Sequence, residues 1–177
     1  MTHPSSTPGE STLTSSTRWD SSWPVLLETS ERDRVLGFFA DRFGMNPSVF
    51  AGYELRKRGS SIWIVRSDPR LPALSRLKVR SVGIMLLRQV GRYLKPTSAA
   101  VQIFGIYAEK NVIGLTPQQL EELVGQGEIR GDFAATPGYV IISLEGLPVG
   151  CGLNLPPRIL SRFPPLFRGK NVALRNE

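Results

Sequence analysis

The sequence predicts an α+β protein in which a helix and antiparallel strands precede a small closed β-structure with one or two short helices. Three stretches lead to this prediction. Residues 30–43 carry apolar side chains at helical spacing. Residues 52–66 alternate between apolar and polar side chains on either side of a turn. Residues 138–153 are mostly apolar and contain several glycines. Because glycines let paired strands approach closely, we expect a closed barrel rather than a parallel sheet.

The chain divides into a tail and two folded units. Residues 1–22 are mostly Ser, Thr, Pro and Gly, and we expect a disordered tail because they can bury little apolar surface. The 177 residues suffice for one large or two small cores. Pro96 disfavours a helical conformation at Lys95, and it has no backbone N–H to donate to a neighbouring strand. We therefore predict units over residues 23–95 and 96–177.

The first unit begins with a helix. Ser30 is suited to cap it, its apolar side runs from Val35 to Phe43, and Gly44 is suited to end it. The other elements expected here are a hairpin of residues 52–57 and 61–66, a helical connector over 68–75, and strands over 77–80 and 82–88 with an irregularity at 81–83.

The second unit contains a helix with a clear start. Thr116 precedes Pro117 and stands three residues before Gln119, which is the pattern of a capping box, and we expect the helix to end near Gly125. The other expected elements are strands over 99–106, 138–144 and 149–153, proline-broken turns over 156–165, and a short closing strand at Val172 and Leu174.

The positive charge is segregated along the chain. The formal net charge is +7, but residues 51–100 alone carry +9, residues 101–150 carry −4 and residues 151–177 carry +4. Such segregation indicates a polyanionic partner such as a nucleic acid. The alternative is a basic surface that only keeps the protein soluble.

The basic side chains form two candidate RNA-binding sets. Long cations contact phosphates without strict spacing, and Arg also stacks on exposed bases. The first set is Arg56, Lys57, Arg58, Lys78, Arg80, Arg88 and Arg92, and the second is Arg158, Arg162, Arg168 and Lys170.

The sequence gives little indication of a catalytic site. Cys151 lies between two glycines in an apolar stretch, and the single histidine, His3, lies in the tail. A nucleophile with its base is therefore not expected, nor is a metal cluster, and Cys151 is better explained as a small core residue. No glycine-rich loop follows a strand in the way that a nucleotide site requires. We expect no catalytic residue, no metal and no cofactor.

The sequence also gives an expectation for the cellular compartment of the protein. One cysteine cannot form an internal disulfide, which fits a reducing environment. No apolar run approaches the roughly 20 residues that span a bilayer, and the first residues lack the pattern of a secretory signal. We expect a cytoplasmic protein with no membrane partner.

Two short stretches resemble a known family. Residues 138–142 (GYVII) and 146–153 (GLPVGCGL) resemble the end of a PUA-type RNA-binding barrel. With residues 108–111 before the helix at Thr116, and with the stretch from Arg158 to Arg168, the pattern is similar to the C-terminal region of Sun-family RNA cytosine-5 methyltransferases. It is also similar to Nip-family ribosome-biogenesis factors, in which a helix and antiparallel strands precede the PUA domain. The resemblance covers about 150 residues of the 177.

The resemblance implies an RNA-binding function. Residues 23–95 would be a pre-PUA-like unit and residues 96–177 a PUA-like one. The expected role is a non-catalytic accessory protein in rRNA or tRNA maturation, in ribosome biogenesis or RNA modification, because the S-adenosylmethionine site and catalytic centre of the methyltransferases have no counterpart here. Two alternatives remain: a protein–protein adaptor among pre-ribosomal proteins, and the RNA-binding subunit of a separate RNA cytosine-5 methyltransferase.

Overall fold

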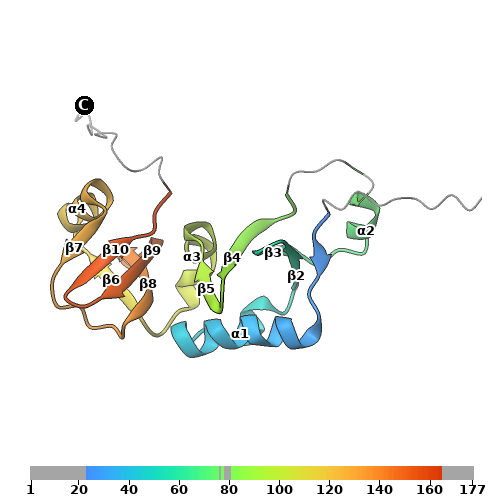
Figure 1. Cartoon of the computed structure of the whole chain (residues 1–177), viewed down its shortest axis with the longest axis horizontal. Coiled ribbons are helices and arrows are strands. Elements are labelled where there is room, and N and C mark those ends of the chain that lie inside the picture. Colours follow the sequence, from blue (N-terminus) through green and yellow to red (C-terminus); the bar gives the residue numbers. More distant parts are fainter. Residues whose placement is uncertain (1–22, 76, 78–80, 165–177) are drawn as a thin grey trace, which may run out of the picture.

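The computed structural model describes residues 23–75, residue 77 and residues 81–164. Within them the chain forms two five-stranded sheets, which lie side by side along the long axis of the molecule (Figure 1). Helix α1 runs along the first sheet and α3 lies between the two sheets. The α+β class is therefore confirmed. The predicted tail (residues 1–22) and the predicted strand at Val172 and Leu174 lie outside the described residues.

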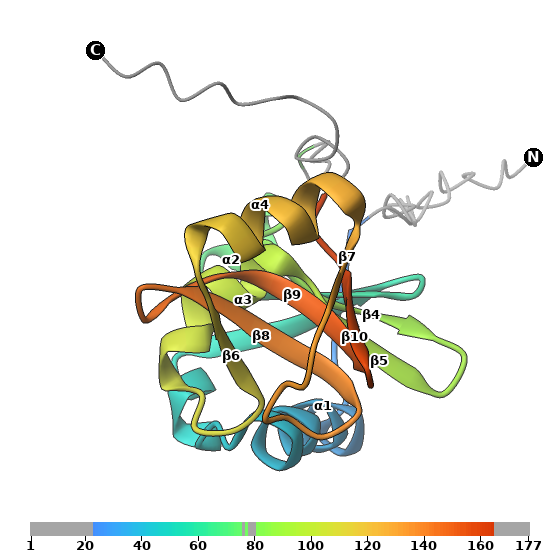
Figure 2. The ribbon, with the colours of Figure 1, turned by 90° about the vertical axis from the view of Figure 1, so that its left-hand side faces the viewer.

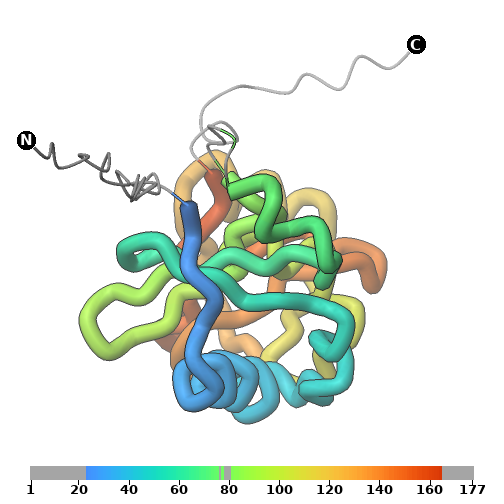
Figure 3. The backbone as a smooth tube through the Cα atoms, turned by 90° about the vertical axis from the view of Figure 1, so that its right-hand side faces the viewer, coloured from blue at the N-terminus to red at the C-terminus, as the bar shows by residue number. Residues whose placement is uncertain are grey.

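The first sheet is an antiparallel meander with the strand order β1-β2-β3-β4-β5. Figure 3 views it from the β1 side, with β1 (blue) descending into α1. The predicted hairpin is confirmed, because Arg58 pairs with Ser61 across a tight turn in which Gly59 has a φ of 57°. The strands are β1 (Val25–Leu26), β2 (Tyr53–Arg58), β3 (Ser61–Arg66), β4 (Ile84–Val90) and β5 (Tyr93–Pro96).

Two connections between strands of the first sheet agree with the prediction. The predicted helical connector is α2 (Leu71–Leu74). The predicted irregularity occurs at Gly83, whose φ of 67° places its backbone directly against Ile64. A side chain there would collide with the Ile64 carbonyl. Most of the strand predicted over residues 77–80 lies outside the described residues.

Helix α1 (Thr29–Phe43) packs its apolar side on the first sheet. Val35, Phe39 and Phe43 recur every four residues and are buried. The helix ends as predicted, because Gly44 adopts the left-handed conformation that closes a helix. The predicted cap is wrong by two residues: the cap position falls on Glu28, and no side chain bonds to the first helical N–H groups.

The second sheet has the order β6-β8-β9-β10-β7 and curls into a half-barrel (Figure 2). Its strands are β6 (Val112–Leu115), β7 (Glu128–Arg130), β8 (Gly138–Leu144), β9 (Leu147–Leu155) and β10 (Arg158–Ser161). The expectation of a sheet without parallel pairing is wrong for one pair, because β6 runs parallel to β8. The chain between them is long enough for a crossover through α4.

Two segments of the second unit differ from the prediction. The stretch over residues 99–106, expected as a strand, forms α3 (Ser98–Phe104) and the 3₁₀ turn η2 (Gly105–Tyr107). The reason is that Thr97 caps this helix by accepting a hydrogen bond from the Ala100 N–H. Residues 158–161, expected as turns, form strand β10, which pairs with both β9 and β7.

Helix α4 (Pro117–Gln126) confirms its predicted start. Thr116 accepts from the Gln119 N–H and the Gln119 side chain accepts from the Thr116 N–H, so both halves of the capping box are present. The helix passes the expected end at Gly125 and closes at Gly127, whose φ of 81° is left-handed.

Strand β8 joins two hydrophobic clusters. Because side chains alternate along a strand, Val140 and Ile142 enter the cluster inside the half-barrel, whereas Ile141 enters the cluster shared with α1 and α3. Cys151 on β9 packs in the same shared cluster as Ile141. The shared cluster therefore takes residues from both sides of the predicted boundary at residues 95 and 96, and the division into two units stays a prediction.

Glycines on β9 allow the half-barrel to close, as the sequence predicted for tight packing. A Cβ atom at Gly150 would overlap the ring of Phe163, and one at Gly152 would stand 2.8 Å from the Cγ2 atom of Ile159. Both positions face the inside of the half-barrel, where there is no room for a side chain.

We therefore expect Gly150→Ala to lower the free energy of unfolding by about 1–3 kcal/mol through overpacking. The matched control is Gly125→Ala on α4, where a Cβ atom meets nothing within 4 Å. That exchange should stabilise the protein by about 0.5–1 kcal/mol. Urea unfolding of both variants measures the difference, and equal stabilities would refute the packing argument.

Candidate nucleic-acid interface

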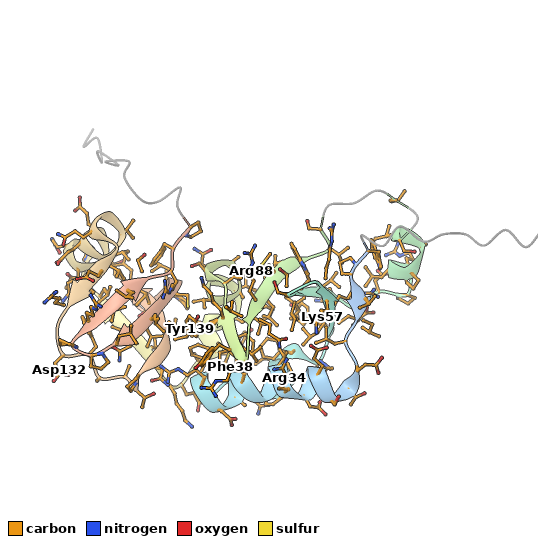
Figure 4. All side chains as sticks on the ribbon, in the orientation of Figure 1. Arg34, Phe38, Lys57, Arg88, Asp132 and Tyr139 are labelled. Atoms are coloured by element: carbon orange, nitrogen blue, oxygen red, sulfur yellow. The ribbon has the colours of Figure 1, made fainter. Side chains whose placement is uncertain are left out.

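A cleft of about 940 Å³ lies where α1, the β4–β5 hairpin and the start of β8 approach one another. Three aromatic side chains line it: Phe38 from α1, Tyr93 from β5 and Tyr139 from β8. Figure 4 shows Phe38 and Tyr139 together near the middle of the molecule, whereas Asp132 lies at the far end of the second sheet. The cleft is thus built by both sheets and by α1.

The cleft is strongly basic. Asp41 is the one carboxylate among the described residues that line it. Clustered like charges in a concave site raise the local positive potential, which attracts anions. The cations come from segments far apart in the sequence and are Arg34, Arg42, Arg92, Lys95 and Arg162.

Arg42 fixes one wall of the cleft. Its guanidinium donates to the carbonyl oxygens of Tyr139 at 2.6 Å, Thr136 at 2.8 Å and Pro137 at 3.1 Å, and also to the Thr136 hydroxyl at 2.6 Å. Partial burial lowers the pKa of Arg42, although the group stays charged at neutral pH. With its donors engaged in this way, Arg42 is chiefly a clamp between α1 and the start of β8.

Asn111 completes this clamp. Its side-chain amide donates to the Arg42 carbonyl at 2.7 Å, and its side-chain oxygen accepts from the Thr136 N–H at 2.9 Å. Gly138 has a φ of 121°, and a Cβ atom there would press on the Arg42 guanidinium. The backbone before β8 is therefore held to the end of α1, which places Tyr139 beside the cleft.

Lys95 and Arg162 have a different role. Among the described residues, neither side chain has a hydrogen-bonding or ion-pair partner, and the Nε atom of Arg162 is buried without one. The backbone of Arg162 is fixed by its N–H bond to the Cys151 carbonyl at 3.0 Å. Both residues also line a second cavity of about 460 Å³, formed with Arg88, Ser98 and Phe163. They stand at the junction of the two cavities.

Three members of the predicted basic sets lie at these cavities. Arg92 and Arg162 line the larger one, and Arg88 lines the smaller one beside Arg162. Arg92 stacks over the Tyr93 ring at 5.1 Å and donates to its hydroxyl at 3.0 Å. The structure therefore brings one residue of the C-terminal set next to two of the first.

Arg56 is engaged within the fold. It is 8% exposed, and its guanidinium forms an ion pair with Glu54 at 2.7 Å and donates to the Pro24 carbonyl at 3.2 Å. It also lies over the ring of Trp23. Arg56 thus anchors the start of the described chain to β2, and it is not part of the cleft.

The other predicted cations lie elsewhere. Lys57 forms an ion pair with Glu31 at 2.6 Å, and Arg158 forms one with Glu128 at 2.9 Å near the β7 edge of the second sheet. Arg58 is exposed beside the β2–β3 turn and does not line either cavity. Lys78, Arg80, Arg168 and Lys170 lie outside the described residues.

Sequence reasoning missed several lining residues, although one signal was present. Arg34, Phe38 and Arg42 follow one another at intervals of four residues, so they share one side of α1. Tyr93 directly follows Arg92, a cation next to an aromatic residue. Tyr139 gave no such signal, because only the paired strands bring it to α1.

Cys151 is a buried thiol beneath this basic cleft. Burial raises the pKa of Cys151 to about 12, against the opposing effect of the nearby charges of Lys95, Arg162 and Arg42. A thiol that keeps its proton at neutral pH is a poor nucleophile. The expectation of a small core residue is confirmed in that Cys151 is completely buried in the shared cluster.

Three further features of the described part of the chain bear on its chemistry. No three His, Cys, Asp or Glu side chains gather there as metal ligands. None of the helices described is long and apolar enough to cross a bilayer. Glu121 and Glu122, which adjoin in sequence, are both exposed on α4.

The Cys151 thiol should make stability fall at high pH. Above about pH 9 the thiol ionises in the unfolded chain but not in the native one, so this group lowers the free energy of unfolding by about 1.4 kcal/mol per pH unit up to about pH 12. Urea unfolding at two alkaline pH values should show a smaller loss for Cys151→Ala than for the unmodified protein. Equal losses, or rapid labelling of the native thiol at neutral pH, would contradict this burial.

Comparison with models of protein families and with curated proteins found no significant match to this chain. The likeness to PUA domains therefore stays a resemblance of short sequence stretches.

Proposed function

We propose that this protein is a non-catalytic RNA-binding accessory factor in rRNA or tRNA maturation, and that the cleft is its RNA interface. The observation that supports the proposal most is the cleft itself, which is lined by five cations and three aromatic side chains but by one carboxylate among the described residues. Cations bind phosphates and aromatic rings bind exposed bases, so this combination suits RNA. The sequence resemblance to PUA-type proteins supports RNA and its maturation as the setting.

The placement of the cations favours the cleft over the surfaces first predicted. Arg56, Lys57 and Arg158 each form an ion pair with a carboxylate, as does Arg34 at the cleft. A paired cation must give up its partner before it can bind a phosphate. Lys95 and Arg162, by contrast, have no such partner among the described residues. The RNA-binding roles predicted for the paired cations are therefore less favourable than the role proposed for the cleft.

An adaptor function is the second candidate, because one exposed surface is apolar. Ile103, Ile106 and Tyr107 on α3 and η2 are each about half exposed, and Leu147 at the β8–β9 turn is 64% exposed. The two segments adjoin, since a Cβ atom at Gly105 would stand 2.9 Å from Pro148. Exposed apolar side chains that gather in this way suit a protein partner. A separate RNA cytosine-5 methyltransferase is one such partner, and copurification tests it.

The double exchange of Lys95 and Arg162 to Ala tests the cleft. If each side chain binds one phosphate of single-stranded RNA, affinity should fall about tenfold or more at about 0.1 M salt, and the slope of log K against log salt should decrease by about 1.4. The charge-matched control exchanges Arg130 and Arg158, which line neither cavity. Fluorescence anisotropy with labelled RNA measures both variants.

The control should bind as the unmodified protein does, and thermal unfolding should show both variants to be folded. If the control loses affinity and the cleft variant does not, the interface lies at the β7–β10 edge and the cleft proposal is wrong. If the unmodified protein shows no salt-dependent RNA binding, the RNA-binding proposal is wrong and the adaptor function is favoured.

A further inference from the structure

The cleft has the size and lining of a pocket for a single group rather than of a surface for a duplex. Its volume of about 940 Å³ is in the range of small-molecule sites. Phe38, Leu94, Tyr139 and Leu153 contribute apolar surface to its wall. A duplex presents phosphates outward and keeps its bases stacked, so it offers nothing apolar to such a wall. An unstacked base does.

Tyr93 provides a prepared stacking surface. Tyr93 is 60% exposed, although it lines the cleft. The guanidinium of Arg92 lies over one face of the ring and donates to its hydroxyl, and these contacts favour the orientation that the ring has here. A ring ordered before binding loses less entropy when a base stacks on it. Phe38 from α1 and Tyr139 from β8 line the same cleft.

Arg162 provides the second, independent observation. A buried N–H group without an acceptor is unfavourable, and here the Nε atom of Arg162 is in that position. The backbone of Arg162 is held to β9, and the next residue, Phe163, is buried in the half-barrel. Arg162 is therefore kept at the junction of the two cavities beside Lys95. Because this Nε atom is shielded from solvent, a phosphate at this junction would bind the terminal nitrogens of the Arg162 guanidinium together with the Lys95 ammonium group.

We propose that the cleft takes one unpaired nucleotide of a single-stranded RNA, with its base against Tyr93 and Tyr139 and a phosphate on Lys95 and Arg162. The strand continues through the smaller cavity, where Arg88 provides the next cation. This inference rests on the proposed RNA-binding function and specifies its substrate as unpaired RNA. The structural reason is that the apolar wall meets, at Lys95, the two cations without a side-chain partner in the described part of the chain, since Lys95 lines both cavities.

The experiment uses the full chain and three labelled RNAs of about 12 nucleotides, a length within the usual range of single-strand sites. They are a single strand, the same sequence as a blunt duplex, and the single strand with one abasic position. The single strand should bind at least about tenfold more tightly than the duplex. A single strand carrying 2-aminopurine should change in fluorescence on binding, because the base leaves its neighbours and stacks on protein.

Tyr93→Ala should weaken binding of the single strand about 5- to 150-fold, and Tyr93→Phe should restore most of it because the ring is kept. The matched control is Tyr107→Ala, which removes an exposed tyrosine that does not line the cleft. On the RNA with an abasic position in the cleft, Tyr93→Ala should have no further effect. Circular dichroism verifies that each variant is folded.

Two results would overturn this inference while RNA binding itself stands. One is equal affinity for single strand and duplex, and the other is a Tyr93→Ala variant that binds as Tyr107→Ala does. Binding of free adenosine monophosphate that saturates the cleft without any binding of the oligonucleotide would also overturn it, in favour of a small-molecule site. Absence of salt-dependent binding to all three RNAs would instead refute the proposed function.

Discussion

The structure depends on strand β8 being buried on both faces. Val140 and Ile142 fill the half-barrel, and Ile141 between them packs into the cluster of α1 and α3. Because side chains alternate along a strand, one short apolar run serves both clusters and fixes the two sheets side by side. The cleft lies at this junction. Arg42 ties the end of α1 to the carbonyl groups just before and at the start of β8, and Tyr139 is held there as a wall.

The elements that the sequence predicted correctly carry local signals. Gly44 ends α1 in the left-handed conformation, and Thr116 with Gln119 forms the capping box of α4. The error at α3 has a physical cause: a short apolar run has no period that separates strand from helix. The hydrogen bond by which Thr97 caps this segment favours the helix. The parallel pairing of β6 with β8 also could not be predicted, since it depends on the crossover through α4 rather than on either strand.

The sequence predicted the positive charge of the candidate site but not its position in the fold. The excess of positive charge in residues 51–100 indicated an anionic partner, yet Lys57 is paired with Glu31, which lies 26 residues away in the chain. Such pairing exists only in the folded protein. The series Arg34, Phe38 and Arg42 was visible at helical spacing, whereas the contact of Arg42 with Tyr139 joins residues 97 apart. Chain folding therefore determines which cations remain available for a ligand.

The proposed route of the nucleic acid runs between α1, the β4–β5 hairpin and β8. Photochemical crosslinking of the full chain to single-stranded RNA, followed by mass spectrometry of the peptides, tests this most directly, because crosslinks form only at side chains in contact with a base. We predict crosslinks in the peptides that contain Tyr93, Tyr139 and Phe38. Crosslinks confined to the peptides around Arg130 and Arg158, at the β7–β10 edge, would contradict it.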